Sequence, residues 1–316
     1  MLRASLLAAV AFTLLVPAAA SAARPGVTTG AAADIAQTTV TLTGRVDPNG
    51  KATTYFFQYG TSPLYGALTP EVPAGAGANA RIVTTAVGAL APFTTYHYRL
   101  VARNADGLTR GARRTFRTKR QPLGLTLGAN PGAVAPGGAT TLAGNLGGTG
   151  NGNRQVVLQA NPFPFTQGFV NVSNVLVTDA AGNFSFPVLS VPLTTQYRVQ
   201  MPTNPGVISP IVTVPVLVQV TTHVKRTKLH GGKYRARFRM YGSIRPVRDG
   251  AAVRIQKRRH GQWITVRSTF AKPASGGRSR YYKKFRLRTG GRFRVLVETA
   301  GDFASNTGRE VSVRVH

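Results

Sequence analysis

Apolar residues recur at every second position in many short stretches of this 316-residue chain, and this period limits the folds open to it. Residues 39–46, for example, alternate between polar side chains and apolar or small ones, and similar stretches are separated by Gly, Pro and Asn. No apolar period of 3.6 residues follows residue 22. A period of two is typical of strands with one buried face. The sequence therefore predicts an all-β protein built from short strands.

The chain contains no cysteine, so disulfides cannot stabilise it and each domain needs a hydrophobic core of its own. Composition changes twice along the sequence. A basic strand gives way to a nearly uncharged segment near residue 120, and a Val-rich run ends near residue 220, where Lys and Arg become dense. We therefore predict three tandem β-sandwich domains, at residues 23–120, 121–220 and 221–316.

Residues 1–22 have the pattern of a secretory signal peptide. Arg3 supplies the basic start, residues 6–16 are apolar, Pro17 ends this stretch, and residues 20–22 are the small Ala-Ser-Ala. We expect cleavage after Ala22 and a secreted, extracellular or cell-envelope protein. The apolar stretch is shorter than the roughly 20 residues that span a bilayer, so no membrane span is expected in the mature chain.

Two motifs in the first domain point to a known family. Residues 46–50 read Val-Asp-Pro-Asn-Gly, a turn sequence, and residues 90–107 begin Leu-Ala-Pro-Phe-Thr-Thr-Tyr and continue as an alternating strand. Over about residues 25–119 the chain resembles the fibronectin type III domains of bacterial secreted proteins. The resemblance implies that Tyr96 is a structural residue, the tyrosine of a tyrosine corner, whose hydroxyl ties the strand entrance to nearby backbone. Leu42 stands where many family members bury a tryptophan.

The second and third domains resemble each other. Residues 143–146 and 155–159 parallel residues 241–244 and 252–256, and Gln196 to Gln200 parallels Arg292 to Leu296. A repeat of about 97 residues is too long for a solenoid unit and fits tandem domains. Both segments resemble bacterial immunoglobulin-like modules, so the chain is predicted to hold three immunoglobulin-like or fibronectin type III-like β-sandwiches after its signal peptide.

Catalytic chemistry finds little support in this sequence. The whole chain has nine acidic residues, and four of them, Asp47, Asp106, Asp179 and Asp249, have sequence contexts typical of turns. The five histidines stand alone, without cysteines or carboxylates at metal-ligand spacing. We therefore predict no enzyme activity, no metal and no cofactor.

Charge is concentrated in the third domain. Residues 221–316 hold 25 of the 40 basic side chains and four acidic ones, whereas residues 121–220 hold two and one. Residues 233–240 alternate strictly, which puts their aromatic and apolar side chains in the core and four cations in solvent; residues 284–288 repeat the pattern. If these are neighbouring strands of one sheet, seven cations share a surface, and we predict a polyanion-binding site formed by Lys233, Arg235, Arg237, Arg239, Lys284, Arg286 and Arg288.

The predicted function is that of a non-catalytic binding and spacer protein whose basic domain adheres to an anionic cell-wall polymer or polysaccharide. Trp263, Tyr281 and Tyr282 are candidates to stack on sugars or bases. One alternative is a general basic coat without a specific partner, and another is an accessory module that supports extracellular polysaccharide degradation. Nucleic acid is a further candidate partner. The sequence does not indicate an oligomeric state.

Overall fold

The structure is a computed structural model that describes residues 23–227, 237–287 and 289–314. The described residues form strands in several antiparallel sheets and contain no helix, which confirms the predicted all-β fold. The chain divides into two compact units, Met1–Gln121 and Pro122–His316. Among the described segments, no helix is long and apolar enough to cross a membrane.

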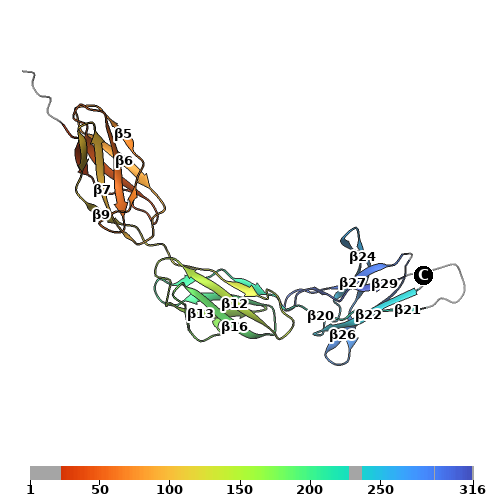
Figure 1. The fold of residues 1–316 in the computed structure, drawn as a ribbon. Coiled ribbons are helices and arrows are strands. Elements are labelled where there is room, and N and C mark those ends of the chain that lie inside the picture. Colours follow the sequence, from red (N-terminus) through yellow and green to blue (C-terminus); the bar gives the residue numbers. More distant parts are fainter. Residues whose placement is uncertain (1–22, 228–236, 288, 315–316) are drawn as a thin grey trace, which may run out of the picture. The chain divides into compact units, whose positions relative to one another are not determined.

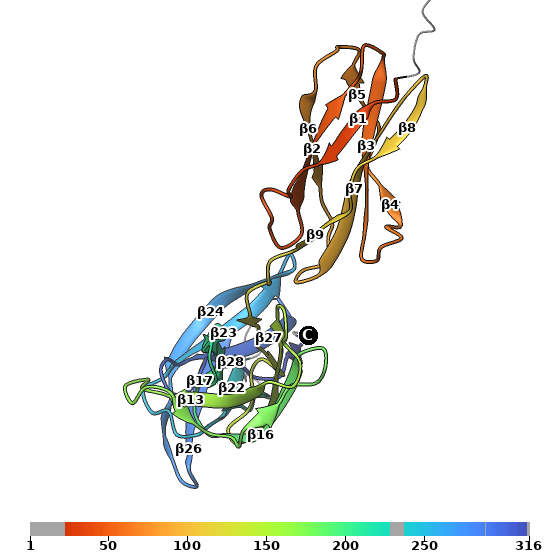
Figure 2. The ribbon, with the colours of Figure 1, turned by 90° about the vertical axis from the view of Figure 1, so that its left-hand side faces the viewer.

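The first unit is a sandwich of two sheets (Figure 2). One sheet contains β1 (Gly26–Thr29), β2 (Val40–Asp47) and β6 (Arg81–Val87). The other is centred on β3 and β7 and contains β3 (Thr53–Gly60), β4 (Ala67–Leu68), β5 (Val72–Gly75), β7 (Thr95–Asn104), β8 (Gly107–Arg110) and β9 (Arg114–Arg117). This two-sheet arrangement is that of a fibronectin type III or immunoglobulin-like fold.

Alternation along the strands builds the core of this unit. In β2 the side chains of Val40, Leu42 and Val46 are buried, and Leu42 is fully enclosed in the position where the resemblance suggested a tryptophan. The turn between β2 and β3 is tight because Asn49 and Gly50 both have a positive φ, of 51° and 77°. Positive φ at two successive residues is the geometry of a type I′ turn, which favours Asn-Gly, and here the turn carries the chain from one sheet to the other.

The second unit contains four sheets that pack as two pairs (Figure 1). In the first pair, one sheet consists of β10 (Gly124–Leu125), β11 (Gly128–Asn130), β12 (Gly138–Gly147) and β16 (Asn183–Val191). Its partner consists of β13 (Gln155–Pro162), β14 (Val170–Asn171), β15 (Leu176–Val177), β17 (Thr195–Met201), β18 (Val207–Ile208) and β19 (Val212–Val214).

The second pair of sheets holds the basic segment. One sheet consists of β20 (Gln219–Val220), β21 (His223–Thr227), β22 (Arg237–Arg245), β25 (Lys272–Ala274) and β26 (Arg278–Arg286). The other consists of β23 (Ala252–Arg259), β24 (Gln262–Phe270), β27 (Gly291–Glu298), β28 (Asn306–Thr307) and β29 (Val311–Val313). Phe238, Met240 and Phe285 point into the core between them, as alternation predicts.

A short extended segment joins the two sandwiches of the second unit. Val216 forms a parallel bridge with Val134, and the next residue, Leu217, forms one with Ala304. The Ala304 N–H donates to the Val216 carbonyl at 2.7 Å, and both Val216 and Val218 are fully buried. One hydrophobic cluster includes buried residues of both sandwiches.

The same three-residue contact occurs in each of the three sandwiches. An arginine on one central strand donates through Nε to a glutamine directly opposite on the neighbouring strand, and its guanidinium lies over an aromatic ring that follows the glutamine in sequence. The trios are Arg99, Gln58 and Tyr65; Arg198, Gln159 and Phe169; and Arg294, Gln256 and Trp263. Directly opposed side chains and cation–π contacts both stabilise sheets. The sequence likeness was inferred only between the second and third domains, and this contact is shared by the first sandwich as well.

Candidate polyanion-binding face

The central contact of the candidate site is the antiparallel pairing of β22 with β26. Their register places Arg237 opposite Arg286 and Arg239 opposite Lys284. Residues that lie directly opposite each other on antiparallel strands project from the same side of the sheet. Because Phe238 and Phe285 are buried on the inner side, these four cations lie on the outer side.

Four of the seven predicted binding residues are thus brought together on one surface. Lys284 and Arg286 are exposed, and Arg237 and Arg239 are half-buried. The other three, Lys233, Arg235 and Arg288, lie outside the described residues.

The structure adds residues to this surface that the sequence analysis missed. β21 pairs with the other edge of β22 and places Lys225 beside Arg239. Arg280, opposite Ser243, continues the outer positions of β26. We use the name basic face for the part of the outer side of β21, β22 and β26 that is formed by His223, Lys225, Arg237, Arg239, Tyr241, Arg280, Tyr282, Lys284 and Arg286.

Three aromatic rings form a row across the basic face. The register aligns His223 with Tyr241 and Tyr241 with Tyr282. The His223 and Tyr241 rings stack at 5.5 Å between centroids, and the Arg239 guanidinium lies 4.9 Å from the Tyr241 centroid. Tyr282 is 50% exposed, and the Lys272 ammonium lies 6.0 Å from its ring centroid. Cations lie on both sides of the row, at Lys284 and at Arg280.

The basic face carries uncompensated charge. Among the described residues, no carboxylate lies within ion-pair distance of its six cations. Acidic residues of the same sandwich are engaged elsewhere: Asp302 pairs with Arg248, Glu298 pairs with Arg254, and Asp249 accepts a hydrogen bond from Ser279. Like charges opposite each other on paired strands cost a few tenths to about 1 kcal/mol per pair. A bound anion would remove this cost.

Two cations on the opposite sheet have a different environment. Arg254 on β23 pairs with Glu298 at 2.7 Å. Arg294 on β27 donates to Gln256 at 2.8 Å and covers the Trp263 ring at 4.5 Å. These two side chains are held by contacts within the fold, whereas Arg258, Arg267 and Arg292 of the same sheet are exposed.

Open hollows follow one another along the basic face. One of 460 Å³ is lined by Arg239, Tyr241, Arg280, Tyr282 and Lys284. A second, of 280 Å³, shares Arg239 and Lys284 with the first, and a third, of 550 Å³, shares Tyr241 and Arg280 with it. A continuous series of open hollows suits an extended polymer better than a small enclosed ligand.

Two of the three aromatic residues proposed for stacking are not available for it. Tyr281 is buried beneath the basic face, where its hydroxyl donates to the Thr221 carbonyl at 2.7 Å. Trp263 lies on β24, at the edge of the opposite sheet, beneath Arg294. Only Tyr282 of these three reaches the basic face, since adjacent strand residues point to opposite sides.

The Tyr96 hydroxyl in the first unit accepts a hydrogen bond from the Ala91 N–H at 2.9 Å. Its ring stacks on Phe116 at 5.5 Å with an interplanar angle of 12°. The contact joins the entrance of β7 to backbone five residues upstream, which is the geometry of a tyrosine corner. Within the described part of the chain, no group of three or more His, Asp or Glu side chains is placed to hold a metal ion.

No family model matches the chain, and no curated protein matches it. Among solved structures, the chicken CNTN1 FN1–FN3 domains are 16% identical, with a TM-score of 0.31, and the match covers 92% of this chain and 99% of that one. A tetra-tandem repeat from the extending region of a large adhesion protein is 13% identical, with a TM-score of 0.27, covering 92% of this chain and 74% of that one. The sensor domain of the anti-sigma factor RsgI4 from Pseudobacteroides cellulosolvens, in its longer form, is 16% identical, with a TM-score of 0.24, covering 30% and 89%. At these identities no ligand or partner is transferred to this chain.

Proposed function

We propose that this chain is an exported, non-catalytic binding and spacer protein that adheres to anionic polymers through the basic face. The observation that carries the proposal is the set of six cations on β21, β22 and β26 that lack a carboxylate partner among the described residues. The first sandwich, which we assign to the fibronectin type III modules on its tyrosine-corner contact, and the middle sandwich act as spacers.

The chemistry of the face favours phosphate or carboxylate groups repeated along a polymer. Four of its six cations are arginines, whose planar guanidinium makes forked hydrogen bonds to either group. Outer residues of one strand are separated by about 6.8 Å, so Arg280, Lys284 and Arg286 present charges at intervals along β26. We favour an anionic cell-wall polymer or acidic polysaccharide, with the Tyr282 ring contacting sugar rings.

Binding of the mature chain to a purified poly(glycerol phosphate) wall polymer and to polygalacturonate tests this proposal. We expect affinity to fall steeply with salt, because each neutralised phosphate or carboxylate releases counterions. Replacing Arg237, Arg239, Lys284 and Arg286 together by Gln is expected to weaken binding by at least tenfold and to lower the salt slope by about three.

The matched control removes the same charge from the rest of the sandwich. Arg258, Arg292, Arg309 and Arg314 are exposed and line none of the three hollows of the basic face, and their replacement by Gln is expected to change affinity less than about threefold by loss of long-range attraction alone. Equal losses in the two variants would show a general basic coat. Tighter binding to single-stranded DNA than to both polymers at matched charge would reassign the partner to nucleic acid.

A further inference from the structure

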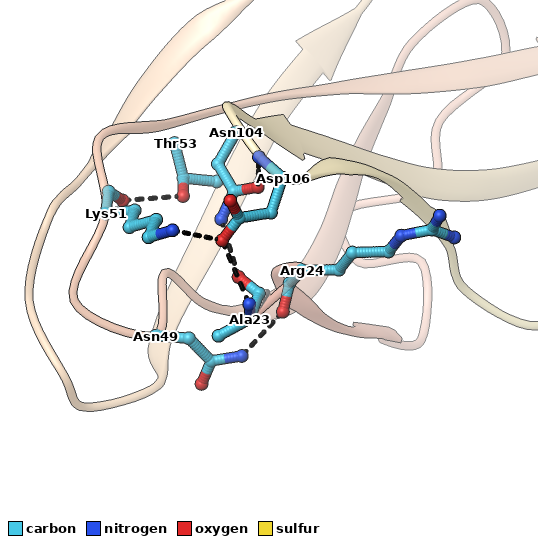
Figure 3. A network of polar contacts seen from close by, with 7 residues as sticks. All are labelled: Ala23, Arg24, Asn49, Lys51, Thr53, Asn104 and Asp106. Atoms are coloured by element: carbon cyan, nitrogen blue, oxygen red, sulfur yellow. Dashed lines mark hydrogen bonds and ion pairs between the residues drawn. The ribbon is translucent and has the colours of Figure 1, made fainter. Parts of the chain in front are cut away.

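The residues that follow the predicted signal peptide are held by three hydrogen bonds (Figure 3). The backbone nitrogen of Ala23 donates to the Asp106 carboxylate at 2.9 Å. The Ala23 carbonyl accepts from the Asn104 side-chain amide at 2.9 Å, and the Arg24 carbonyl accepts from the Asn49 amide at 2.6 Å. All three partners are side chains more than 20 positions away in sequence.

Two turns of the first unit supply the side chains that hold Ala23 and Arg24. The turn between β7 and β8 supplies Asn104 and Asp106, and Asn104 orders it by accepting from the Asp106 N–H at 3.0 Å. The turn between β2 and β3 supplies Asn49 and Lys51, and the Lys51 ammonium pairs with Asp106. The Asp106 side chain is only 15% exposed. The surrounding fold therefore fixes the position of the Asp106 carboxylate.

The hydrogen bond to Lys51 holds the pKa of Asp106 below its ordinary value, with a further contribution from the Ala23 N–H. The carboxylate is therefore ionised at neutral pH. The charged groups beside the Ala23 nitrogen are Asp106 and Lys51 from the two turns and Arg24, the next residue. Asp47, at the end of β2, accepts a hydrogen bond from the Asn49 N–H in the β2–β3 turn.

Signal-peptide removal changes the chemistry of this nitrogen. A signal peptidase adds water across the Ala22–Ala23 peptide bond, leaving a carboxylate on Ala22 and an amine on Ala23, which takes up a proton at neutral pH. A peptide N–H is one neutral donor, whereas the ammonium group carries a full positive charge and three donors. A charge-assisted hydrogen bond is shorter and stronger than a neutral one.

We propose that the mature chain begins at Ala23 and that its new α-ammonium group forms an ion pair with Asp106 in a socket made by the β2–β3 and β7–β8 turns. Processing thus completes the first sandwich by adding a partly buried charge pair at the start of the chain. A start even one residue earlier or later moves the ammonium group by about 3.5 Å and breaks the pair.

The test compares three proteins in which the first residue is set by a specific protease: the chain starting at Ala23, the same chain with one added Gly before Ala23, and the Ala23 chain carrying Asp106→Asn. We expect the α-amine of the first protein to have a pKa about half a unit to one unit above the ordinary value of about 7.7–8.0. Its acylation rate at pH 7 then falls about three- to tenfold relative to the other two. A Glu71→Gln variant is the matched control, because Glu71 pairs with Arg103 elsewhere in the same unit.

The mass of the exported chain and its thermal unfolding provide two further tests. The chain recovered from an exporting host is expected to have the mass of a protein that begins at Ala23. In thermal unfolding, Asp106→Asn is expected to lower the midpoint of the first unit more in the Ala23 chain than in the Gly-extended chain, because only the former loses the terminal ion pair as well as the Lys51 contact. A different first residue, an α-amine pKa unchanged by Asp106→Asn, or equal midpoint shifts in the two chains would each overturn the proposal.

Discussion

Tyr281 supports the basic face from below. Its hydroxyl donates to the Thr221 carbonyl and, because its single proton is thus engaged, accepts from the Thr222 hydroxyl at 3.1 Å. Burial raises the pKa of Tyr281 to about 12, against an ordinary value of 10.0. The folded sandwich therefore favours the neutral phenol of Tyr281. Its hydrogen bonds fix β26 to the segment between β20 and β21.

A pH dependence follows at alkaline pH. Since the folded pKa of Tyr281 lies above the unfolded value, its contribution is fully present below pH 10.0 and is lost as pH rises toward about 12. We expect the free energy of unfolding of the second unit to fall over this range, as measured by urea denaturation at a series of pH values. Tyr281→Phe is expected to flatten the fall while lowering stability at pH 8 by about 1 kcal/mol, for the lost hydrogen bonds. A wild-type protein whose stability is constant from pH 9 to 12 would contradict this assignment.

At the scale of single strands, the pairing of β22 with β26 sets the proposed polymer binding against stability. Arg239 and Lys284 are directly opposed and carry the same charge. We expect Lys284→Glu to raise the free energy of unfolding by a few tenths to about 1 kcal/mol, because it replaces a repulsive cross-strand pair with an attractive one. The same substitution is expected to weaken binding to the wall polymer.

Thermal unfolding and polymer binding of the same preparation check this opposition. Arg309→Glu is the matched control, since Arg309 is exposed and lies outside the strands, so the same charge change is made without a directly opposed cation. A variant at position 284 that is less stable than wild type would show that the cross-strand repulsion is already relieved by solvent.

The alternation of side chains made much of these strands predictable from the sequence. The buried positions of β22 and the outward direction of its arginines follow from a period of two, and so do the core positions of β2. Alternation does not give register, because sliding one strand by two residues keeps the same faces. The row of His223, Tyr241 and Tyr282 depends on that register and could not be found without the structure.

Long-range polar contacts could not be predicted from the sequence, for a different reason. Asp106 precedes Gly and has the sequence signature of a turn residue, which hides its contact with Ala23, 83 positions away. Likewise the sequence offers Tyr281 and Tyr282 as equal candidates for stacking, and only the position of the core decides which of them is buried.

For the molecule as a whole, the chain carries a formal net charge of +31 but distributes it unevenly. The middle sandwich is nearly neutral, and it shares a hydrophobic cluster with the basic one that follows. The segment containing Val216 and Leu217 hydrogen-bonds to both. The second unit therefore has no exposed linker at this point at which its two sandwiches would separate freely.

We predict that residues 122–316 unfold as one cooperative unit. Hydrogen exchange under mild denaturant is expected to show the same opening free energy for the central strands of both sandwiches. Val216→Ala is expected to lower both by about 2 kcal/mol, because it leaves a cavity in the shared cluster. The half-buried Val212 provides the control, and Val212→Ala is expected to have a smaller effect. Two separate opening energies, with Val216→Ala lowering only one, would show that the sandwiches unfold independently.

The strands β22 and β26 bury the side chains on their inner side and present those on their outer side to solvent, so substitutions are tolerated on the outer side only. Phe238, Met240 and Phe285 secure the interior, whereas the residues that meet the surroundings take no part in it. The outer positions can therefore be randomised as a library on an unchanged scaffold. If the proposed adhesion to anionic polymers holds, such a library could redirect it to a different target without changing how the chain folds.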